Sequence, residues 1–600
     1  MKALLFSPYA LISRHESVEL DLITYLLSTK WEVDVIQCNG LLNDFCVSMA
    51  SMGLNHASSN LSKNLVCMSC KAARNTIRRT ESGARFHLLE QWSKHIPPDL
   101  IDAQLRLLNK DNWHFHEYQG IQIGRLAAVD LLMQYKVNSF HIPDSLWDAY
   151  VRQVKVCYET YFSSHGFLSE ISPDRVIMYN TLFGVNRVVQ QVSEMLGIPC
   201  YSLHLGYQSK SDSNALMMYR DDDSQLTISH TEEAMLCISK PLAPSRIIEA
   251  FKFFDVTLNA LSHTVYSNVY SKVHPEQTRR KLQVKTGRPL LFVPLASVDE
   301  RFALELLGLP SLTKPAELFG RQSEWLKFIL DLARDHEEWE FVIRPHPRMF
   351  PNHRERSMAT EASKLLDLIS SATANVHINL PSDRVSLPEI LQITDVVLGG
   401  TTSAGLEALA YGIPVVTHNK NLLFAYPAQI GSFADSKNSY VSQIRQSINC
   451  NWSVDNMLHA LRWMSFLDST VSRAITAIDQ TSEDNSRFYL TSKSRIMFLR
   501  RFEVFRRLPR FLSLLLGGIY QVRAIRNWLV RDSYFTSEAE AFGRTLTEEL
   551  PGLHSVSQNE IFDEVDELDA LRTHLRKLLE MLGNYDDPNC LSSRIERFLT

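Results

Sequence analysis

Two apolar segments in the second half of the chain each end in residues that could bind an anion. Residues 341–343 are followed by Arg344, His346, Pro347 and Arg348, and residues 395–398 by Gly399, Gly400, Thr401, Thr402 and Ser403. The first group offers two permanent positive charges and an imidazole. In the second group, the glycines allow a tight turn and the hydroxyl residues open a predicted helix, whose unpaired N–H groups favour negative charge. Together these residues predict a phosphate-binding site.

Each motif alone has a simpler interpretation. A His-Pro pair is common in ordinary turns, and a glycine turn before a capped helix occurs in many α/β proteins. Two such motifs at the ends of two strands are less expected from structure alone. Glu407 lies one helical turn after Ser403, where its carboxylate could accept hydrogen bonds from a neutral hydroxyl group such as that of a ribose. These observations favour a nucleotide site.

The segments that must position these residues alternate between strands and helices. The first half predicts strands over 2–6, 32–37, 175–179 and 200–203 and helices over 15–27 and 185–196. After a polar connection at 274–288, strands are expected over 290–294, 339–344, 375–379, 395–398 and 413–417, again with helices between them. This alternation predicts parallel α/β sheets, which bind ligands outside the carboxyl ends of their strands.

The alternation of predicted strands and helices divides the chain into three parts. We expect an α/β protein of two Rossmann-like domains that face a cleft, residues 1–285 on the acceptor side and 286–486 on the nucleotide side. A helical extension, 487–600, follows. Within it, apolar residues recur every three or four positions over 561–582, which predicts an amphipathic helix and offers a surface for an oligomer.

Composition excludes several classes of protein. The 600 residues are 45% hydrophobic and 22% charged, as in ordinary globular proteins. With 62 Lys+Arg against 67 Asp+Glu, the net charge of -5 gives no general reason to expect a nucleic-acid partner. We see neither an apolar run that would span a membrane nor a secretory signal, and therefore expect a cytoplasmic protein.

The paired motifs resemble the nucleotide-sugar-binding half of GT-B glycosyltransferases that build bacterial surface polysaccharides. They look most like the capsule-type transferases with a His-Pro motif, which include Kdo- and sialic-acid-transferring enzymes, and the teichoic acid glycerophosphotransferases are relatives. The family's Asp after the strand that follows the linker is matched by Asp299, although Ala296 stands where a Gln is often found. The Asp-Tyr-Ser-Ser signature of the teichoic acid enzymes is absent.

The resemblance implies roles for these residues. His346 would donate to the nucleotide phosphate, while Thr402 and Ser403 would bind its other oxygens. The chain's own cations would replace a metal ion, so no cofactor is expected for catalysis. The donor would be a nucleotide sugar, activated by cytidine monophosphate (CMP), and the acceptor a surface glycan or its lipid-linked precursor. The alternatives are a nucleotide-sugar 2-epimerase and a non-catalytic scaffold of a capsule assembly complex.

Sugar transfer also needs a general base, which we expect on the opposite side of the cleft, in the first half of the chain. His204 follows the strand predicted at 200–203, and Glu16 follows the first strand. Either residue could accept the proton of an acceptor hydroxyl. Simple surface exposure is the alternative for each.

Two groups of residues invite a metal interpretation. Cys38, Cys46, Cys67 and Cys70 are crowded together, and the two-residue gap between Cys67 and Cys70 suits one tetrahedral zinc ion. A structural zinc site is therefore one hypothesis, and unrelated buried thiols are the other. The acidic run 221–223 resembles a metal-binding Asp-x-Asp motif, but a solvated turn is the simpler interpretation.

The segment 487–531 is strongly basic, with apolar residues interleaved, whereas the tail from 532 onward is acidic. A basic amphipathic segment favours docking on an anionic membrane surface at the inner face of the cell membrane. Packing of this segment against the acidic tail is the alternative.

Overall fold

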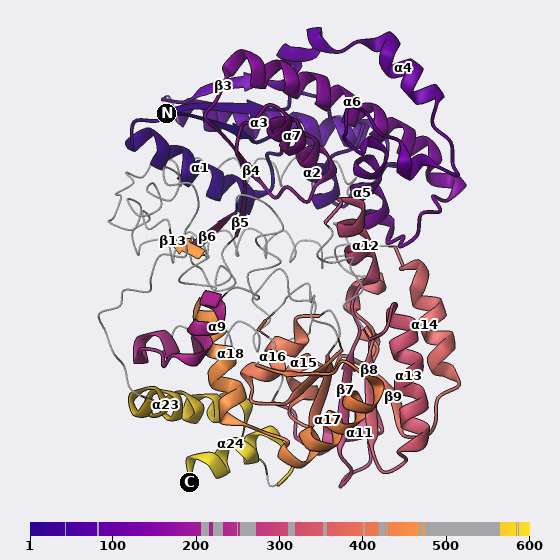
Figure 1. Cartoon of the computed structure of the whole chain (residues 1–600), viewed down its shortest axis with the longest axis vertical. Coiled ribbons are helices and arrows are strands. Elements are labelled where there is room, and N and C mark those ends of the chain that lie inside the picture. Colours follow the sequence, from indigo (N-terminus) through magenta and orange to yellow (C-terminus); the bar gives the residue numbers. More distant parts are fainter. Residues whose placement is uncertain are drawn as a thin grey trace, which may run out of the picture. The chain divides into compact units, whose positions relative to one another are not determined.

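The computed structural model describes most of the chain up to 466 and the C-terminal helices. The described residues are 1–42, 44–80, 83–205, 215–219, 232–248, 250–251, 270, 272–309, 318–351, 357–399, 402–418, 426–427, 430–466, 472–474, 564–583, 585 and 587–600. The basic segment 487–531 and the acidic run 221–223 lie outside them. Figure 1 shows the elements, coloured along the sequence.

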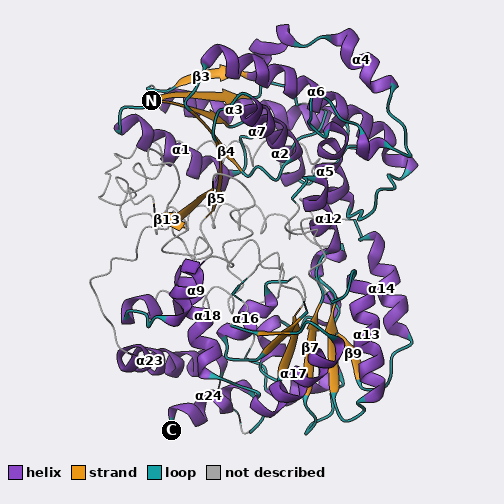
Figure 2. Ribbon diagram, in the orientation of Figure 1, coloured by secondary structure: helices purple, strands orange, loops and turns teal. Residues whose placement is uncertain are grey.

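The chain forms two compact units, each built on its own sheet. The first contains the described residues of Met1–Gln134 and Ser139–Asp222 together with strand β13. The second contains Tyr135–Asn138, the described residues of Asp223–Val471 and the C-terminal helices. Both sheets consist mainly of parallel strands with helices between them, so the predicted α/β class is confirmed (Figure 2).

The sheet of the first unit has the strand order β13-β6-β5-β4-β1-β2-β3. Its strands are β1 (Lys2–Phe6), β2 (Glu32–Gln37), β3 (Arg85–Leu88), β4 (Arg175–Tyr179), β5 (Cys200–Leu205), β6 (Ala215–Tyr219) and β13 (Ser472–Ala474). Strands β3, β2, β1, β4 and β5 are parallel, whereas β6 is antiparallel to both β5 and β13. Because the chain moves outward in both directions from β1 and β4, the order reverses between these two strands.

The helices of this unit connect and cover the strands. They are α1 (Ser13–Ser28), α2 (Val47–Ser51), α3 (Asn60–Thr80), α4 (Pro98–Arg106), α5 (Ile123–Tyr135), α6 (Asp144–Ile171) and α7 (Gly184–Met195). Residues of α1 pack with β1, β2, β4 and β5 in one apolar cluster. Burial of these side chains against the sheet fixes the strand ends on which a site can be built.

The sheet of the second unit has the order β12-β11-β10-β7-β8-β9, and every pair is parallel. Its strands are β7 (Leu290–Pro294), β8 (Glu340–Arg344), β9 (Val376–Ile378), β10 (Val396–Gly399), β11 (Val415–Thr417) and β12 (Ser432–Phe433). All five residues of β7 are buried, as expected for a parallel strand with helices on both faces. The order reverses between β7 and β10.

The helices of the second unit include the C-terminal part of the chain. They are α9 (Glu232–Ser239), α11 (Pro275–Leu282), α12 (Val298–Leu306), α13 (Gln322–Asp335), α14 (Thr360–Ser370), α15 (Leu387–Leu391), α16 (Ala404–Ala410), α17 (Lys437–Cys450), α18 (Val454–Phe466), α23 (Glu564–Leu582) and α24 (Leu591–Leu599).

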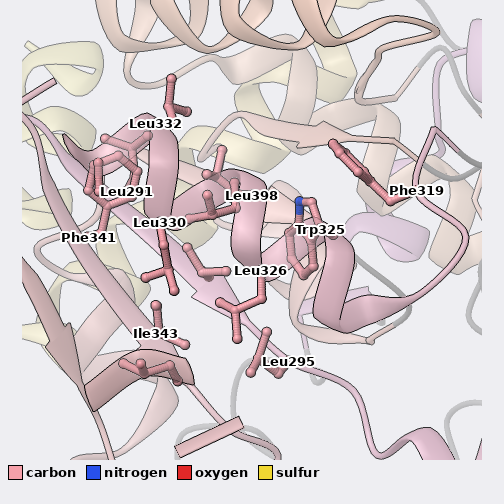
Figure 3. Packing of buried hydrophobic residues seen from close by; sticks show 14 of the residues in the cluster. Leu291, Leu295, Phe319, Trp325, Leu326, Leu330, Leu332, Phe341, Ile343 and Leu398 are labelled. Carbon is pink, nitrogen blue, oxygen red and sulfur yellow. The ribbon is translucent and has the colours of Figure 1, made fainter. Parts of the chain in front are cut away.

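One apolar core joins helix α13 to the strands of this sheet. Figure 3 shows Trp325 and Leu326 of α13 in one cluster with Leu398 of β10 and with Leu291 of β7, which lies beside Phe341. The indole Nε1 of Trp325 donates to the hydroxyl of Tyr440 on α17 at 3.2 Å, which satisfies its polar edge. Each large apolar side chain buried in this way stabilises the fold by about 1.5–3 kcal/mol.

The C-terminal helices differ from the separate extension that the sequence suggested. Helix α23 buries Leu571, Leu575, Leu578 and Leu582, so the predicted amphipathic helix is confirmed. Arg594 of α24 contacts the carboxylate of Asp395 and donates to the carbonyl of Thr394, at 2.5 and 2.8 Å. Both helices therefore belong to the second unit. The chain itself covers the part of the apolar stripe from Leu571 to Leu582, whereas Val565 is exposed, and the oligomer stays a prediction.

Candidate functional site

The His-Pro turn lies directly after β8, at the carboxyl edge of the second sheet. A short 3-10 turn over Pro347–Met349 follows His346, and the Nδ1 of His346 accepts the backbone N–H of Arg348 at 3.2 Å. Burial and the nearby charges of Arg348 and Arg344 lower the pKa of His346 to about 4. The imidazole is therefore neutral at pH 7. With Nδ1 as the acceptor, this assignment places the ring proton on Nε2, which becomes a hydrogen-bond donor.

Arg344 supplies the positive charge beside this imidazole. It is the last residue of β8, and its Nη1 donates to the carbonyl of Val385 at 3.2 Å. Burial lowers its pKa to about 10, while the carboxylates of Glu407, Glu389 and Asp383 act in the opposite direction. The guanidinium therefore remains charged at neutral pH, with the ring of His346 and the carboxylate of Glu407 among its neighbours.

Arg348 and Asp299, both predicted to contact the nucleotide, pair with each other in the structure. Both side chains are buried, and they form an ion pair with each other. The hydroxyl of Ser297 donates to Asp299 Oδ1 at 2.5 Å, so the carboxylate is held from two sides. The ion pair therefore supports the turn after His346. A direct contact of either residue with the nucleotide stays a prediction.

The residues after β10 form a turn into the short helix α16. The hydroxyl oxygen of Thr402 accepts the N–H of Ala404 at 3.3 Å, and the hydroxyl of Ser403 donates to Glu407 Oε1 at 3.2 Å. Gly399 lies 3.0 Å, measured from an added Cβ, from the Val415 side chain, so there is little room for a larger residue. Gly400 and Thr401 lie outside the described residues. Of the three hydroxyl side chains predicted for this turn, two are therefore placed at the carboxyl edge of the sheet.

These turns follow strands at or next to the place where the strand order reverses. Strands β7 and β10 flank the reversal, and β8 pairs with β7 on its other side. In open α/β sheets this place is where loops diverge and leave a crevice for a ligand. Arg344 therefore lies near both His346 and Glu407, and the nucleotide-binding roles of these residues stay predictions.

Lys136 is a supporting residue that the sequence analysis missed. Its side chain is only 1% exposed, and Nζ donates to the backbone carbonyls of Phe350 and Ser357 at 3.2 and 2.6 Å. Phe350 directly follows the 3-10 turn after His346, and Ser357 lies shortly before helix α14. Lys136 thus links these two positions, and it lies close enough to lower the pKa of His346. No local pattern in the sequence indicates this role, because Lys136 is separated from the loop by more than 200 residues.

The two residues proposed as a base are placed only by their backbone. Glu16 lies in the first turn of α1, and His204 lies within β5, where it pairs with Met217 of β6. Strand β5 extends to Leu205, so His204 is inside the strand rather than after it. Their side chains lie outside the described part of the structure, and their roles stay predictions.

The four clustered cysteines lie in the first unit. Cys46 and Cys67 pack against an apolar cluster that includes Cys70, whose thiol donates to the carbonyl of Ala10 at 3.5 Å. Burial raises the pKa of the Cys38, Cys46 and Cys67 thiols, so the neutral forms are favoured. Within the described ranges, no group of three or more His, Cys, Asp or Glu side chains is arranged to hold a metal ion. A structural zinc site stays a prediction that metal analysis can test.

Among the helices that the structure describes, none is both long and apolar enough to cross a bilayer.

Comparisons with known proteins give only distant likenesses. No family model and no curated protein matches the chain. Among solved structures, the KpsC β-Kdo 2,4 transferase of Thermosulfurimonas dismutans is 11% identical, with a TM-score of 0.30, over 50% of this chain and 82% of that one. The UDP-GlcNAc 2-epimerase of Methanocaldococcus jannaschii is 10% identical, with a TM-score of 0.27, over 77% and 98% of the two chains.

The glycosyltransferase VinC in complex with dTDP is 12% identical, with a TM-score of 0.21, over 78% of this chain and 96% of that one. Likenesses of this size do not assign a function.

Proposed function

We propose that this protein is a glycosyltransferase whose second unit binds the nucleotide part of a sugar donor. The observation that carries the proposal is His346, held as a neutral Nε2–H donor beside the guanidinium of Arg344 at the carboxyl edge of the sheet. A neutral donor and a fixed positive charge suit an anionic leaving group. The carboxylate of Glu407, which accepts the hydroxyl of Ser403, suits a neutral hydroxyl of the same ligand.

The chemistry of the step follows from these charges. As the bond between the anomeric carbon and the phosphate oxygen breaks, the electron pair leaves with the nucleotide and negative charge grows on its phosphate. Donors that are already in place stabilise that charge without reorganisation, and a single such donor is worth about 10²–10³-fold in turnover. Arg344 and His346 would perform this task without a divalent cation.

The finer parts of the proposal rest on the sequence resemblance. We propose a CMP-activated donor and an acceptor that is a bacterial surface polysaccharide or its lipid-linked precursor. The basic segment 487–531, which lies outside the described residues, would bind the enzyme to the inner face of the cell membrane through anionic lipid. Salt-sensitive binding to vesicles that contain anionic lipid, compared with neutral vesicles, measures that association.

A nucleotide panel tests the donor site. A ligand at 100 times its dissociation constant stabilises the native state by about 2.7 kcal/mol, which a thermal melt detects. We expect CMP to raise the melting temperature. Stabilisation by uridine diphosphate and not by CMP would reject the cytidine donor, and no stabilisation by any nucleotide would reject the site.

Turnover of His346→Ala tests the catalytic assignment. We expect transfer to fall about 10²-fold or more, while the exposed His141 provides a matched His→Ala control with unchanged turnover. Wild-type turnover in His346→Ala would contradict the assignment. Formation of an epimerised nucleotide sugar in the absence of an acceptor would instead identify an epimerase.

A further inference from the structure

A second arginine lies on the loop that connects β9 to α15, within the second unit. This loop is joined to the end of β8 at two points. The N–H of Asn379 donates to the carbonyl of Ile343 at 2.9 Å. Further along the loop, the carbonyl of Val385 accepts Nη1 of Arg344 at 3.2 Å. Because Arg384 directly precedes Val385, the loop carries a second guanidinium to the same edge of the sheet as Arg344.

The backbone of Arg384 has a conformation that arginine rarely adopts. Its φ and ψ are 54° and 30°, in the left-handed region, where a Cβ crowds the following carbonyl oxygen. Arg384 ends the 3-10 turn Pro381–Asp383. Glycine or asparagine would end such a turn with less strain. Strained residues of this kind cluster at functional sites, so the side chain of Arg384 needs an explanation that the turn itself does not supply.

The guanidinium of Arg384 is available to a ligand. The residue is exposed, and in the described part of the chain no side chain or backbone group forms a hydrogen bond or an ion pair with it. The adjacent carboxylate, that of Asp383, is held by its own loop. Its Oδ2 accepts the N–H of Leu380 at 2.7 Å and the amide of Asn379 at 3.4 Å. Its Oδ1 accepts the hydroxyl of Ser382 at 3.4 Å.

The positive charge of Arg344 is offset by its surroundings. Three carboxylates lie close enough to act on its pKa, those of Glu407, Glu389 and Asp383. One anionic group of a ligand can still bind the guanidinium of Arg344 directly. A second anionic group would meet the negative charge of these carboxylates unless another cation lies nearby. Arg384 is a cation of this kind on the adjoining loop.

We propose that Arg384 binds a second anionic group of the nucleotide-sugar donor, beyond the phosphate at Arg344 and His346, an inference that rests on the proposed function. In a CMP-activated acidic sugar, this group is the carboxylate of the sugar. In a nucleoside diphosphate donor, it is the second phosphate. Both are oxygen anions that a planar guanidinium binds through parallel N–H donors. Arg384 would therefore select donors with two anionic groups over donors with one.

Two pairs of ligands measure this selectivity, because the members of each pair differ by one anionic group. The first pair is CMP-sialic acid and its methyl ester, in which the carboxylate has lost its charge. The second pair is uridine diphosphate and uridine monophosphate. Titration calorimetry with the full chain gives the Kd of each ligand. In the pair that the wild type binds, Arg384→Asn should weaken the first member about 10-fold or more, as expected for loss of a hydrogen bond to a charged group. Binding of the second member should be unchanged.

The variants separate the charge of Arg384 from its backbone strain. Asparagine tolerates the left-handed conformation, so Arg384→Asn removes the charge without adding strain. Its melting temperature should equal or exceed that of the wild type, which a loss of binding through misfolding would not allow. Arg384→Lys keeps a positive charge and should restore part of the affinity. The matched control is Arg280→Gln on α11 of the same unit, where the side chain is 78% exposed. This control should leave the affinity for all four ligands unchanged.

The outcomes distinguish the inference from the proposed function. Weaker binding of CMP-sialic acid alone identifies the sugar carboxylate as the second anionic group, and weaker binding of uridine diphosphate alone identifies the second phosphate. If Arg384→Asn keeps the wild-type affinities, or loses both members of a pair equally, the inference is wrong while nucleotide binding still supports the proposed function. If the wild type binds none of the four ligands, the proposed function is overturned and the inference with it.

Discussion

The buried ion pair between Arg462 and Glu567 should dominate the attachment of the C-terminal helix α23. The pair joins α18 to α23, with Arg462 Nε donating to Glu567 Oε1 at 2.9 Å and Nη2 reaching Oε2. Glu567 Oε1 also accepts the N–H of Leu242 at 2.6 Å, and the side chains of Glu567 and Arg462 are 0% and 7% exposed. Solvent therefore does not screen this interaction.

The change to make is Glu567→Gln, which keeps the shape and can still accept the N–H of Leu242. It leaves the buried guanidinium of Arg462 without a counter-charge, and breaking a buried pair in this way costs about 3–5 kcal/mol. The matched control is Asp569→Asn on the same helix. Asp569 pairs with Arg572 at 3.2 Å, but these side chains are 67% and 45% exposed, and such surface pairs contribute about 0–1 kcal/mol.

Urea unfolding of the full chain, together with hydrogen exchange of α18 and α23, measures the difference. With an m-value of about 3 kcal/mol/M, Glu567→Gln should lower the transition midpoint by about 1 M or more. Exchange should accelerate first in α23. The double change Arg462→Met with Glu567→Leu should cost less than Glu567→Gln alone, because no unpaired charge remains. Equal losses for Glu567→Gln and Asp569→Asn would refute this reasoning.

Two further predictions concern the supporting residues of each unit. Lys136→Met removes the donor that holds the carbonyls of Phe350 and Ser357. This substitution should lower turnover more than nucleotide affinity, and Lys136→Arg should restore part of the lost turnover. An unchanged kcat in the Met variant would show that the His346 turn holds its place without Lys136. If the cysteine cluster holds zinc, elemental analysis of the purified protein should find about one equivalent, and Cys67→Ser should reduce it. Folded wild-type protein without metal would end that hypothesis.

The sequence by itself determined the parallel strands and the polar residues at their ends. Strands β1, β4 and β7 begin and end at the residues predicted, because each is a short apolar run bounded by turns. The approach of His346 to Arg344 followed for the same reason, since both residues are close together in the chain and come directly after one strand. These features are predictable because they depend only on the periodicity of apolar and polar residues over a short stretch of sequence.

Only the tertiary structure decided which distant residues pair. Asp130 meets Gly184 across 54 residues, Arg348 meets Asp299 across 49, and Arg462 meets Glu567 across 105. The first pairing holds the start of α7 against α5, and the second joins two residues that the sequence placed in the nucleotide site. The pairing of Arg462 with Glu567 joins helix α23 to the rest of the second unit. No spacing in the sequence predicts such pairs, because strand order and helix packing, rather than separation along the chain, bring the charged groups together.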